Sequence, residues 1–544
     1  QLDRSSHYIS VAGMPSKWCL SSAEMTGGDL GTPHTVNEVC LISDWDDDGF
    51  TEEAGDCDDE KASVFPGAEE RWDGLDNDCD GAVDDVREAG ATSHLEGRGD
   101  DHLGWYSAVS SGDINGDGAI DLLAGSSLAE PDERGRVWVM DGNEFLDWDG
   151  HVTDEALAVI EGGGDYSYFG SMGAKLGDAN KDGIDDLLVV GTDAYGSSAS
   201  AGVYAGSLFY GHASLEGTLF ESDADVLFQS STAGYWFVSA LSHVDVDSDG
   251  HDDVLIGNYY ASTGSYGDVF FFSGATLGES EIYQLDTDAD LRIRGASAGD
   301  YLGYSLAAAD TNRDGDVELF VSASGAADEG MDRAGCVYML PSAALGEGVG
   351  LSLTVTESAS FKICASTAHA RLGRNASPQL FDVNGDDLLD IVLAAPGSDF
   401  GGTESLGTVM VFINDGTFSG VASTADAHAI LTAGDARYFG NALHHADLDG
   451  DGESELVVGA PDFDRYDDEV EYSGEVHVYR ASTLAEGGTI PASDADLYID
   501  GSGTTGFGSA LRSADFDDNG SAELIVAAPR WSGTMGRISV FAFD

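Results

Sequence analysis

Seven copies of one acidic pattern, Asp-x-(Asp/Asn)-x-(Asp/Asn)-Gly-x-x-(Asp/Glu), recur along the chain and limit the folds that it can adopt. The copies begin at Asp113, Asp178, Asp245, Asp310, Asp382, Asp447 and Asp515, so that successive copies start 65 to 72 residues apart. A long and nearly constant period indicates that one structural unit is repeated. The fold must therefore accommodate seven equivalent units.

The residues between the acidic copies have the pattern of short β-strands. In the unit that starts at Tyr301, apolar and aromatic stretches occupy residues 302–309, 319–323, 335–340 and 361–364, between Gly- and Asp-rich turns. These stretches show no sustained helical period. Four short strands per unit, repeated radially, are the arrangement of a β-propeller blade. We therefore expect an all-β, seven-bladed β-propeller over residues 86–544.

The two ends of the repeat array predict how the ring closes. The last unit ends with the strand-like residues 537–543 and lacks the fourth strand that other units have before the next Leu/Phe-Gly pair. Residues 91–96 precede Leu103-Gly104 and so occupy that place at the front of the array. We expect residues 91–96 to complete the last blade, because this pairing would leave no exposed sheet edge at the junction.

The acidic copies have the composition of calcium-binding loops. Side-chain oxygens at positions 1, 3, 5 and 9 and a main-chain carbonyl at position 7 supply the oxygen ligands that Ca²⁺ prefers. Gly at position 6 permits a sharp turn, although the fifth copy has Asp387 there. The acid at position 9 comes too early for a helix-flanked EF-hand, so we expect β-hairpin loops closed by metal. Turns of Asp, Asn and Gly without metal are the alternative, which seven copies in register disfavour.

We expect about seven Ca²⁺ ions in the propeller. The expected ligands are Asp113, Asn115, Asp117, Ala119, Asp121, Asp178, Asn180, Asp182, Ile184, Asp186, Asp245, Asp247, Asp249, His251, Asp253, Asp310, Asn312, Asp314, Asp316, Glu318, Asp382, Asn384, Asp386, Leu388, Asp390, Asp447, Asp449, Asp451, Glu453, Glu455, Asp515, Asp517, Asn519, Ser521 and Glu523.

Residues 44–85 form a second acidic segment, which is separate from the repeats. The segment is too short for a conventional core, so we expect a disulfide and two or more Ca²⁺ ions to hold it. Its expected ligands are Asp44, Asp46, Asp48, Asp56, Asp58, Asp59, Asp76, Asp78, Asp80 and Asp84. Residues 1–43 are expected to be an N-terminal segment that contains a disulfide loop.

The six cysteines can be paired by position as Cys19–Cys40, Cys57–Cys79 and Cys336–Cys364. Six cysteines allow 15 connectivities, so this pairing is a hypothesis. Cys336 and Cys364 fall on the expected third and fourth strands of one blade, where a cross-strand disulfide or two buried thiols would fit. Together with the calcium pattern, the even cysteine count predicts an oxidising extracellular or periplasmic location.

The charge of the chain excludes several classes of partner. The chain has 100 Asp and Glu against 23 Lys and Arg, which gives a net charge of −77. Such a surface repels phosphate backbones and anionic lipid head groups, so we expect no nucleic-acid partner. No apolar run approaches the roughly 18 residues of a membrane helix, so direct membrane insertion is not expected. Common catalytic motifs such as HExxH, a P-loop or a nucleophile elbow are missing from the sequence, which favours a non-enzymatic protein.

The units resemble the FG-GAP repeats of the seven-bladed integrin α-subunit propeller. Phe169-Gly170, Phe439-Gly440 and Phe507-Gly508 match the first half of that motif, and Gly459-Ala460-Pro461 matches the second. The resemblance implies that the calcium loops join strands 1 and 2 on one face and that ligands bind the opposite face. This chain differs in that its first four units lack the Pro and all seven units carry an acidic loop.

Residues 44–85 are similar to a short Cys/Asp metal-binding motif of bacterial surface proteins and to thrombospondin type 3 calcium repeats. The former resemblance implies a bacterial, secreted or cell-surface protein. That motif has also been linked to copper. Copper is disfavoured here because alternating carboxylates suit Ca²⁺ and no cluster of His or Met accompanies them.

The face opposite the acidic loops is expected to carry aromatic and acidic side chains on its connections. These residues are Tyr166, Tyr168, Tyr195, Tyr235, Trp236, Tyr259, Tyr260, Tyr266, Phe400, Phe463, Tyr466 and Trp531, with Asp132, Glu133, Asp399, Asp462, Asp464, Asp467 and Asp468 between them. Aromatic side chains on rigidly mounted loops suit protein or glycan recognition, although packing between blades would use some of the same rings.

We therefore expect a non-enzymatic, extracellular, calcium-stabilised propeller that acts in adhesion or in recognition of a protein or glycan at a cell surface. One alternative is a structural subunit of an extracellular filament, layer or complex. A second alternative is an enzyme that acts on a polysaccharide or phosphoester, for which the fold alone offers only an analogy.

Overall fold

The computed structural model divides the chain into two compact units, residues 1–85 and 86–544. It describes residues 18–20, 39–41, 44–46, 48–99, 101–105, 108–129, 134–163, 169–170, 174–190, 203–230, 237–260, 264–278, 280–345, 351–397, 406–416, 418–434, 438–461, 474–501, 506–530 and 535–543.

The first unit contains little regular secondary structure in its described part. Strands β1 (Trp18–Leu20) and β2 (Val39–Leu41) pair antiparallel, with Cys19 opposite Cys40. Residues 44–46 and 48–84 form turns, and among them the structure describes one short 3-10 helix, η1 (Glu52–Ala54). Among the described apolar side chains before residue 85, Val64 alone is almost fully buried, with 1% of its surface exposed. A core of this size cannot hold the segment by itself, which explains its need for cross-links.

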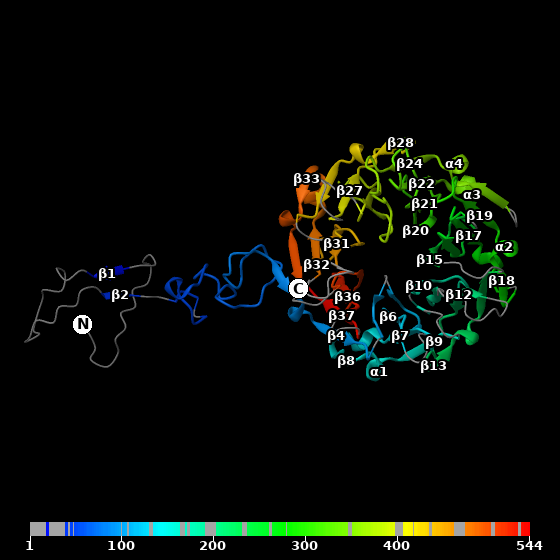
Figure 1. The fold of residues 1–544 in the computed structure, drawn as a ribbon. Coiled ribbons are helices and arrows are strands. Elements are labelled where there is room, and N and C mark those ends of the chain that lie inside the picture. Colours follow the sequence, from blue (N-terminus) through cyan, green and yellow to red (C-terminus); the bar gives the residue numbers. More distant parts are fainter. Residues whose placement is uncertain are drawn as a thin grey trace, which may run out of the picture. The chain divides into compact units, whose positions relative to one another are not determined.

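The second unit is a ring of seven five-stranded sheets, which confirms the expected seven-bladed β-propeller (Figure 1). The first strands of successive blades are in contact all the way round: β5, β10, β15, β20, β25, β30, β35 and again β5. These strands lie nearest the centre of the ring in Figure 1, and the fifth strands lie at its rim. Every blade therefore has two neighbouring blades, and the ring is closed.

Blades 1 to 4 follow one another along the chain. Blade 1 consists of β5 (Val109–Gly112), β6 (Asp121–Ser126), β7 (Arg136–Met140), β9 (Ala158–Glu161) and β13 (Gly217–Phe220). Blade 2 consists of β10 (Ala174–Gly177), β11 (Asp186–Val190), β12 (Val203–Phe209), β14 (Val226–Ser230) and β18 (Ile282–Gln284). Blade 3 consists of β15 (Phe237–Val244), β16 (Asp253–Asn258), β17 (Asp268–Phe272), β19 (Leu291–Arg294) and β23 (Leu351–Thr354). Blade 4 consists of β20 (Leu302–Ala309), β21 (Glu318–Ala323), β22 (Cys336–Leu340), β24 (Phe361–Cys364) and β28 (Gly420–Ser423).

Blades 5 to 7 include strands from both ends of this unit. Blade 5 consists of β25 (Gln379–Phe381), β26 (Asp390–Ala394), β27 (Thr408–Phe412), β29 (Ala429–Thr432) and β33 (Gly488–Pro491). Blade 6 consists of β30 (Ala442–Ala446), β31 (Glu455–Ala460), β32 (Glu475–Tyr479), β34 (Leu497–Asp500) and β3 (Asp85–Arg87). Blade 7 consists of β35 (Ala510–Ala514), β36 (Glu523–Ala528), β37 (Arg537–Phe541), β4 (Ser93–Glu96) and β8 (Asp149–His151).

The helices of the propeller are short. The α-helices are α1 (Val152–Glu155), α2 (Leu285–Asp288), α3 (Ser342–Leu345), α4 (Val355–Ser358) and α5 (Ala481–Ala485). The 3-10 helices are η2 (Glu88–Gly90), η4 (Gly142–Asp147), η5 (Glu221–Asp223), η6 (Gly274–Thr276), η7 (Thr424–Asp426) and η8 (Ala492–Asp494). None of the described helices has the length and apolar character needed to cross a membrane.

The fifth strand of each sheet corrects the expectation of four strands per blade. Strand β13 lies in sequence between the third and fourth strands of blade 2, yet it pairs in parallel with β9 of blade 1, with Gly217 opposite Ala158. The same exchange links each later blade to the one before it. These segments are mostly exposed and lack an alternating apolar pattern, so they do not stand out as strands in the sequence.

The ring closes as the sequence predicts. Strand β4 pairs antiparallel with β37, so that residues from the front of the propeller unit complete its last blade. The backbone N–H of Thr92 extends this pairing by donating to the carbonyl of Val540 at 2.7 Å. Strand β3 of the same N-terminal stretch adds to the edge of blade 6. Two successive blades are thus fastened by one segment.

The hydrophobic core lies between neighbouring blades. One cluster combines Leu95 and Ile538 of blade 7 with Val109 and Leu122 of blade 1. The Leu or Phe of each described Leu/Phe-Gly pair is buried in such a junction; the exposed fraction is 0% for Leu103 and 1% for Phe169. At Gly104, the Gly of the first pair, φ is +80°, and a Cβ would lie 2.6 Å from the Ala527 Cβ of the neighbouring blade 7. The pair therefore sets how closely two sheets approach.

Candidate functional site

Each acidic loop joins the first and second strands of its blade. In blade 1 the loop spans residues 113–121, and its ninth residue, Asp121, pairs with Gly112 across the β5–β6 hairpin. The corresponding pairs are Gly177–Asp186, Val244–Asp253, Ala309–Glu318, Phe381–Asp390, Ala446–Glu455 and Ala514–Glu523. Since all seven hairpins point the same way along their blades, the loops share one face of the ring.

Backbone hydrogen bonds direct the acidic side chains of each loop inward. In the first loop, Asp113 accepts from the N–H of Asp117 with Oδ1 at 3.1 Å and from the N–H of Gly118 with Oδ2 at 3.0 Å. Asn115 accepts from the N–H of Asp117 at 2.8 Å, and Asp117 from that of Ala119 at 2.8 Å. The bond from position 6 to the first Asp recurs in all seven loops. This network brings alternate side-chain oxygens together.

The fifth loop keeps this geometry although it lacks the Gly. Asp387 adopts a left-handed backbone conformation with φ of 71°, and its N–H donates to Asp382 Oδ2 at 2.6 Å. Gly118 of the first loop has φ of 94° and makes the equivalent bond. Asp is among the residues that tolerate this conformation best, so the substitution does not distort the loop.

The acid at position 9 is buried in every loop, with at most 3% of its surface exposed. Burial raises the pKa of this carboxyl to about 7 in Asp121, Asp186, Asp253 and Glu523, and to about 8 in Glu455. The other acids of the same loop raise the pKa further by repulsion. A cation among these acids would remove the repulsion and stabilise the charged form.

The donor set fits a hard divalent cation. In the third loop, carboxylate oxygens of Asp245, Asp247 and Asp253 lie within 4.8 Å of one another. In the sixth loop, Oδ1 of Asp447 is buried and has no hydrogen-bond partner. Buried carboxylate oxygens are normally paired, so an unpaired one among other acids indicates a place for a cation. These observations leave the individual ligands and the carbonyl ligands of position 7 as predictions.

The acidic turns of residues 44–85 repeat this arrangement in the first unit. The groups Asp44/Asp46/Asp48 and Asp46/Asp56/Asp59 each bring carboxylate oxygens within 4.8 Å of one another. One buried oxygen each of Asp44, Asp46, Asp48 and Asp56 has no hydrogen-bond partner. Asp46 belongs to both groups, so two cation sites could share it.

A further acidic group contains a residue that the sequence analysis did not select. Glu70 lies with Asp76 and Asp78, accepts from the N–H of Asp78 at 2.6 Å and has a second, buried oxygen without a partner. Burial raises the pKa of Glu70 to about 7. Asp84, the expected ninth ligand, accepts from the N–H groups of Asp73 and Gly74, and its role as a ligand stays a prediction. Glu70 stands outside the Asp-x-Asp spacing, which is why the motif did not reveal it.

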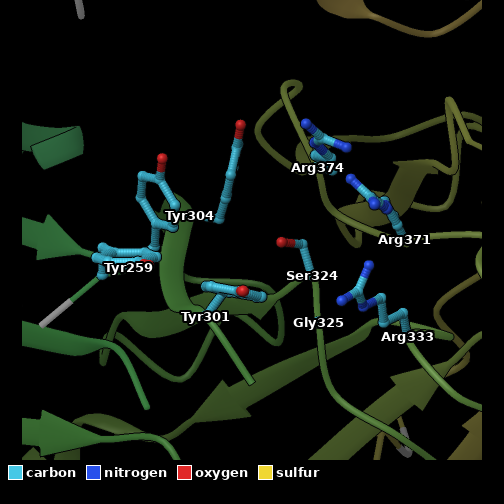
Figure 2. A pocket seen from close by; sticks show the side chains of 9 residues that line it. Tyr259, Tyr301, Tyr304, Ser324, Gly325, Arg333, Arg371 and Arg374 are labelled. Atoms are coloured by element: carbon cyan, nitrogen blue, oxygen red, sulfur yellow. The ribbon is translucent and has the colours of Figure 1, made fainter. Parts of the chain in front are cut away.

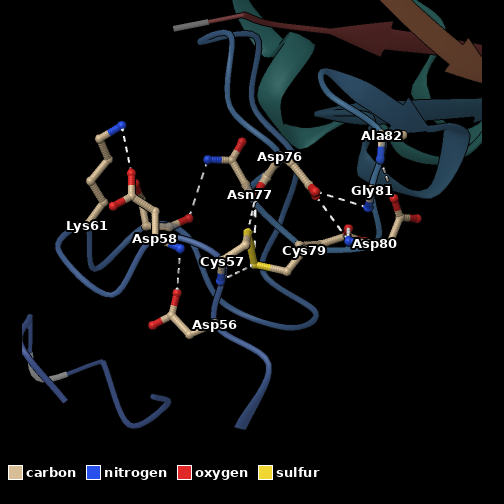
Figure 3. The surroundings of a disulfide bond; sticks show 12 residues. Asp56, Cys57, Asp58, Lys61, Asp76, Asn77, Cys79, Asp80, Gly81 and Ala82 are labelled. Atoms are coloured by element: carbon tan, nitrogen blue, oxygen red, sulfur yellow. Dashed lines mark hydrogen bonds and ion pairs between the residues drawn. A yellow bond between two sulfur atoms is a disulfide. The ribbon is translucent and has the colours of Figure 1, made fainter. Parts of the chain in front are cut away.

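Two of the three expected disulfides are present among the described side chains. Cys57 and Cys79 join the two acidic halves of residues 44–85, with their Cα atoms 5.6 Å apart (Figure 3). Cys336 and Cys364 face each other across β22 and β24 with a Cα–Cα distance of 4.1 Å. For Cys19 and Cys40 the structure gives the backbone pairing only, so their disulfide stays a prediction.

The face opposite the acidic loops is described only in part. Most of the aromatic and acidic residues expected there lie outside the described residues, and Tyr259, Tyr260 and Tyr266 lie within them. Tyr259 and Tyr260 follow β16, at the end of blade 3 that is opposite its acidic loop. The two rings line a cavity of about 430 Å³ together with residues of blade 4 and of the connections beside it.

This cavity has an aromatic wall and a basic wall (Figure 2). The aromatic wall consists of Tyr259, Tyr260, Tyr301 and Tyr304, whose neighbouring ring centroids are 4.8 to 6.2 Å apart. The basic wall consists of Arg333, Arg371 and Arg374, and the hydroxyl of Ser324 lies between the two walls. The guanidinium carbon of Arg374 is 5.9 Å from the centroid of the Tyr304 ring.

Two family models match parts of the chain. The model described as "FG-GAP repeat" matches residues 105–140, 237–271 and 439–479. The model described as "Putative metal-binding motif" matches residues 56–85. The matched FG-GAP segments belong to blades 1, 3 and 6 of the ring, and each of them contains an acidic loop. The chain is therefore a propeller with FG-GAP repeats, preceded by a metal-binding motif.

Curated relatives include a phospholipase D and an integrin alpha chain. Phosphatidylinositol-glycan-specific phospholipase D of Bos taurus is 28% identical over 379 residues, which are 66% of this chain and 43% of the relative. Integrin alpha-IIb of Homo sapiens is 28% identical over 291 residues, which are 52% of this chain and 24% of the relative. The chain thus spans less than half the length of these relatives.

Among solved structures, a Bacillus licheniformis rhamnogalacturonan lyase matches 80% of this chain and 71% of its own with a TM-score of 0.40 and 13% sequence identity. A second rhamnogalacturonan lyase matches 80% of this chain and 72% of its own with a TM-score of 0.39 and 12% identity. Likeness at this level carries no information about function.

Proposed function

We propose that this propeller with FG-GAP repeats is a calcium-stabilised, non-enzymatic recognition protein that acts outside the cell, where it binds a protein or glycan of a cell surface. The observation that carries the proposal is the contrast between its two faces. One face repeats the same acidic hairpin loop seven times. The connections of the other face differ in sequence from blade to blade, and the described part of that face holds a cavity with aromatic and basic side chains.

The repeated loops support a structural role for calcium. Each loop closes the hairpin of the innermost two strands of its blade, and its buried ninth acid accepts a hydrogen bond from a backbone N–H of the loop. In loops 1, 2, 3 and 5 this acid also accepts one from a residue that follows the third strand. Without a cation, three or four acids would repel one another at this point. Bound Ca²⁺ therefore stabilises the folded hairpin by its binding free energy, about 2.7 kcal/mol per site at one hundred times the Kd.

The variable face supports recognition. Connections at this end of the blades are held by rigid sheets, which is the usual arrangement for binding loops. Similarity to integrin alpha-IIb agrees with this role, and similarity to a phospholipase D agrees with a propeller that accompanies another activity. Since the chain spans less than half of either relative, their activities do not carry over as findings.

Two measurements test the proposal. Bound calcium is counted by elemental analysis, and thermal unfolding is followed with calcium, with magnesium and after chelation. We expect several Ca²⁺ ions per chain, a melting temperature that falls on chelation, and weaker rescue by magnesium because Mg²⁺ demands near-ideal octahedral geometry. A chain that holds no metal and melts alike in all three conditions would refute calcium stabilisation.

The recognition role is tested by binding the labelled chain to arrays of surface glycans and surface proteins with calcium present. Specific, saturable binding is the expected result. Assembly into large particles on calcium addition, seen by light scattering, would replace recognition by the structural-subunit role. Turnover of a polysaccharide or phosphoester that is lost with a point variant of the chain would establish an enzyme instead.

A further inference from the structure

The cavity lined by residues of blades 3, 4 and 5 concentrates positive charge in a protein that has very little of it. The chain carries 23 Lys and Arg against 100 Asp and Glu, yet three of its arginines, Arg333, Arg371 and Arg374, line one cavity. Several other arginines of the propeller are paired with acids, as Arg136 is with Glu161 and Arg294 is with Asp268. In the described part of the chain no ion pair involves the three cavity arginines.

The blade architecture fixes the cavity backbone but does not dictate its side chains. Tyr301 and Arg371 occupy the same repeat position, immediately before a Leu-Gly pair, and both have positive φ, 54° and 56°. The same position holds His102 in blade 1 and Tyr438 in blade 6, with φ of 51° and 59°. The strained conformation is therefore a property of the repeat. The choice of Tyr in one blade and Arg in the next is not.

The position after each Leu-Gly pair completes the two walls. It is Tyr304 in blade 4 and Arg374 in blade 5, whereas Phe439-Gly440 of blade 6 is followed by Asn441. The sequence thus places two tyrosines at one blade junction and two arginines at the next. Because neighbouring junctions are adjacent on the ring, these residues face each other across the cavity (Figure 2).

We propose, building on the recognition role above, that this cavity binds an acidic sugar unit of an otherwise weakly charged glycan. The guanidinium groups supply paired N–H donors that match the two oxygens of a carboxylate. Carboxylates, phosphates and sulfate esters are the anions that arginine recognises best. The tyrosines supply rigid apolar ring faces with hydroxyl groups at their ends, which suits a ring that has both C–H and O–H surfaces. The cavity volume of about 430 Å³ lies in the range of small-ligand sites.

The overall charge restricts the ligand further. A net charge of −77 opposes the approach of a polyanion such as a heavily sulfated glycan or a nucleic acid. A single acid group on an otherwise neutral glycan is repelled much less by the protein and can reach the local positive field of the cavity. A uronic acid or a sialic acid within a neutral glycan has this character.

A sugar fits the cavity better than an acidic peptide does. Peptide main chains are usually recognised by an open sheet edge, an apolar groove or a proline-binding surface. Here the strands beside the cavity, β20 and β21, are paired within their own sheet. The polar groups that face the cavity are side-chain hydroxyls and guanidinium groups, which match sugar hydroxyls and an acid group.

The test is a titration of the full chain, saturated with calcium, by calorimetry or ligand-observed NMR. The probes are D-glucuronic acid and N-acetylneuraminic acid, with D-glucose as the uncharged match, sodium sulfate as the simple anion and N-acetyl-aspartate amide as the acidic peptide unit. We expect binding of at least one sugar acid, no measurable binding of glucose, and weaker binding of the two other anions.

Variants locate the site. Arg371→Gln and Arg374→Gln are expected to weaken binding of the sugar acid about tenfold or more, since each removes charge-assisted hydrogen bonds. Tyr260→Ala, at an exposed ring, is expected to weaken it less. Arg98→Gln is the matched control: it removes one positive charge before a Leu-Gly pair of another blade, where Arg98 pairs with Asp154 in an exposed ion pair. Binding by Arg98→Gln should change by less than about twofold.

Each contrary result overturns the inference. Equal binding of glucose would remove the role of the arginines, and equal or tighter binding of sulfate would make the cavity a simple anion site. Tighter binding of the aspartate amide would make its ligand a peptide. Equal loss in Arg98→Gln would show a general charge effect. No binding of any sugar acid by a chain whose melting still responds to calcium would refute the cavity assignment and leave the proposed function standing.

Discussion

Blades 4 and 7 link their third and fourth strands at the same position of the sheet by different kinds of side-chain pair. In blade 4 the first residue of the third strand and the last residue of the fourth are Cys336 and Cys364, which form a disulfide. In blade 7 the corresponding residues are Arg537 and Glu96, whose side chains form an ion pair at 2.7 Å. The flanking hydrogen bond is also shared: Ala365 N–H donates to Gly335 in blade 4, as Gly97 N–H does to Gly536 in blade 7.

The two blades differ in how far apart in sequence their third and fourth strands lie. The two strands in blade 4 are neighbours in sequence, 28 residues apart at the disulfide, so the covalent bond closes a short loop. The two strands in blade 7 come from opposite ends of the propeller, 441 residues apart, and only non-covalent contacts join them. Ion pairs occupy this position in blades 1 and 3 as well. The position therefore tolerates several kinds of residue pair. The junction of β4 with β37, which we call the seam, has no covalent link between its two strands.

The largest expected effect comes from removing the seam strand. A chain that begins at residue 97 lacks β3 and β4, whereas a chain that begins at residue 85 keeps both and serves as the control. Loss of Leu95 alone, which is fully buried, is worth about 2–5 kcal/mol, so the loss of the whole strand should lower the melting temperature sharply. Calorimetry of the two chains checks this. Equal melting temperatures would show that closure by β4 does not stabilise the ring.

The second prediction moves the disulfide of blade 4 to the seam. The double variant Arg537→Cys/Glu96→Cys places cysteines at the register position that Cys336 and Cys364 occupy. Closing a loop of 441 residues stabilises by at most about 6 kcal/mol in the chain-entropy model, and engineered bonds usually give less.

The seam disulfide is measured by comparing melting of the oxidised and reduced forms of this one variant, which cancels the loss of the ion pair. The double alanine variant at the same two positions shows the cost of losing the pair by itself. If oxidation leaves the melting temperature unchanged, thermal unfolding does not begin at the seam.

The third prediction removes the natural disulfide. Cys336→Ala/Cys364→Ala opens a loop with a sequence separation of 28, which should cost about 3–4 kcal/mol. The ring should stay closed, because the strands of blade 4 remain continuous in sequence. Cys57→Ala/Cys79→Ala, in the other compact unit, is the control and should leave propeller melting unchanged. If removing the disulfide of blade 4 lowered the melting temperature more than removing β3 and β4 does, blade 4 and not the seam would be the more critical link of the ring.

Much of this arrangement could be predicted from the sequence because the acidic loops mark the first two strands of every blade. Counting strands from those marks revealed that the last unit lacks a fourth strand and that residues 91–96 supply it. The fifth strands could not be found in the same way. Segments such as Gly420–Ser423 carry small or polar residues and lie exposed at the rim, so their pairing depends on a neighbouring blade.

The basic wall of the cavity was missed for a related reason. Arg333 is far in sequence from Arg371 and Arg374, and only the adjacency of two blades brings the three together. A signal was present: Tyr301 with Tyr304 and Arg371 with Arg374 flank successive Leu-Gly pairs at the same repeat positions. Comparing repeat positions across blades would have revealed it. The unpaired oxygen of Glu70 had no such signal, because no spacing rule includes it.

The smallest expected effect is a difference in pH dependence between the two blades. At the seam, His94 lies opposite Ser539 and its Nδ1 is 3.1 Å from the Ser539 hydroxyl. At the corresponding place blade 4 has Lys362, which forms an ion pair with Asp328. Burial and the nearby Arg537 lower the pKa of His94, against the opposite influence of Asp149 and Glu96.

A folded-state pKa below the ordinary value of about 6.5 means that the unfolded chain takes up the proton first as the pH falls. The contribution of neutral His94 to stability is therefore complete above that value and is lost as the pH falls toward the folded-state pKa. His94→Gln should remove this part of the pH dependence, and Lys362→Gln should not. The melting temperatures of both variants are measured between pH 8 and pH 5 with calcium saturating throughout. Because the acidic loops are the same in both variants, a difference between the two profiles belongs to the substituted positions. Identical pH profiles for His94→Gln and the unaltered chain would show that the seam is not sensitive to protons.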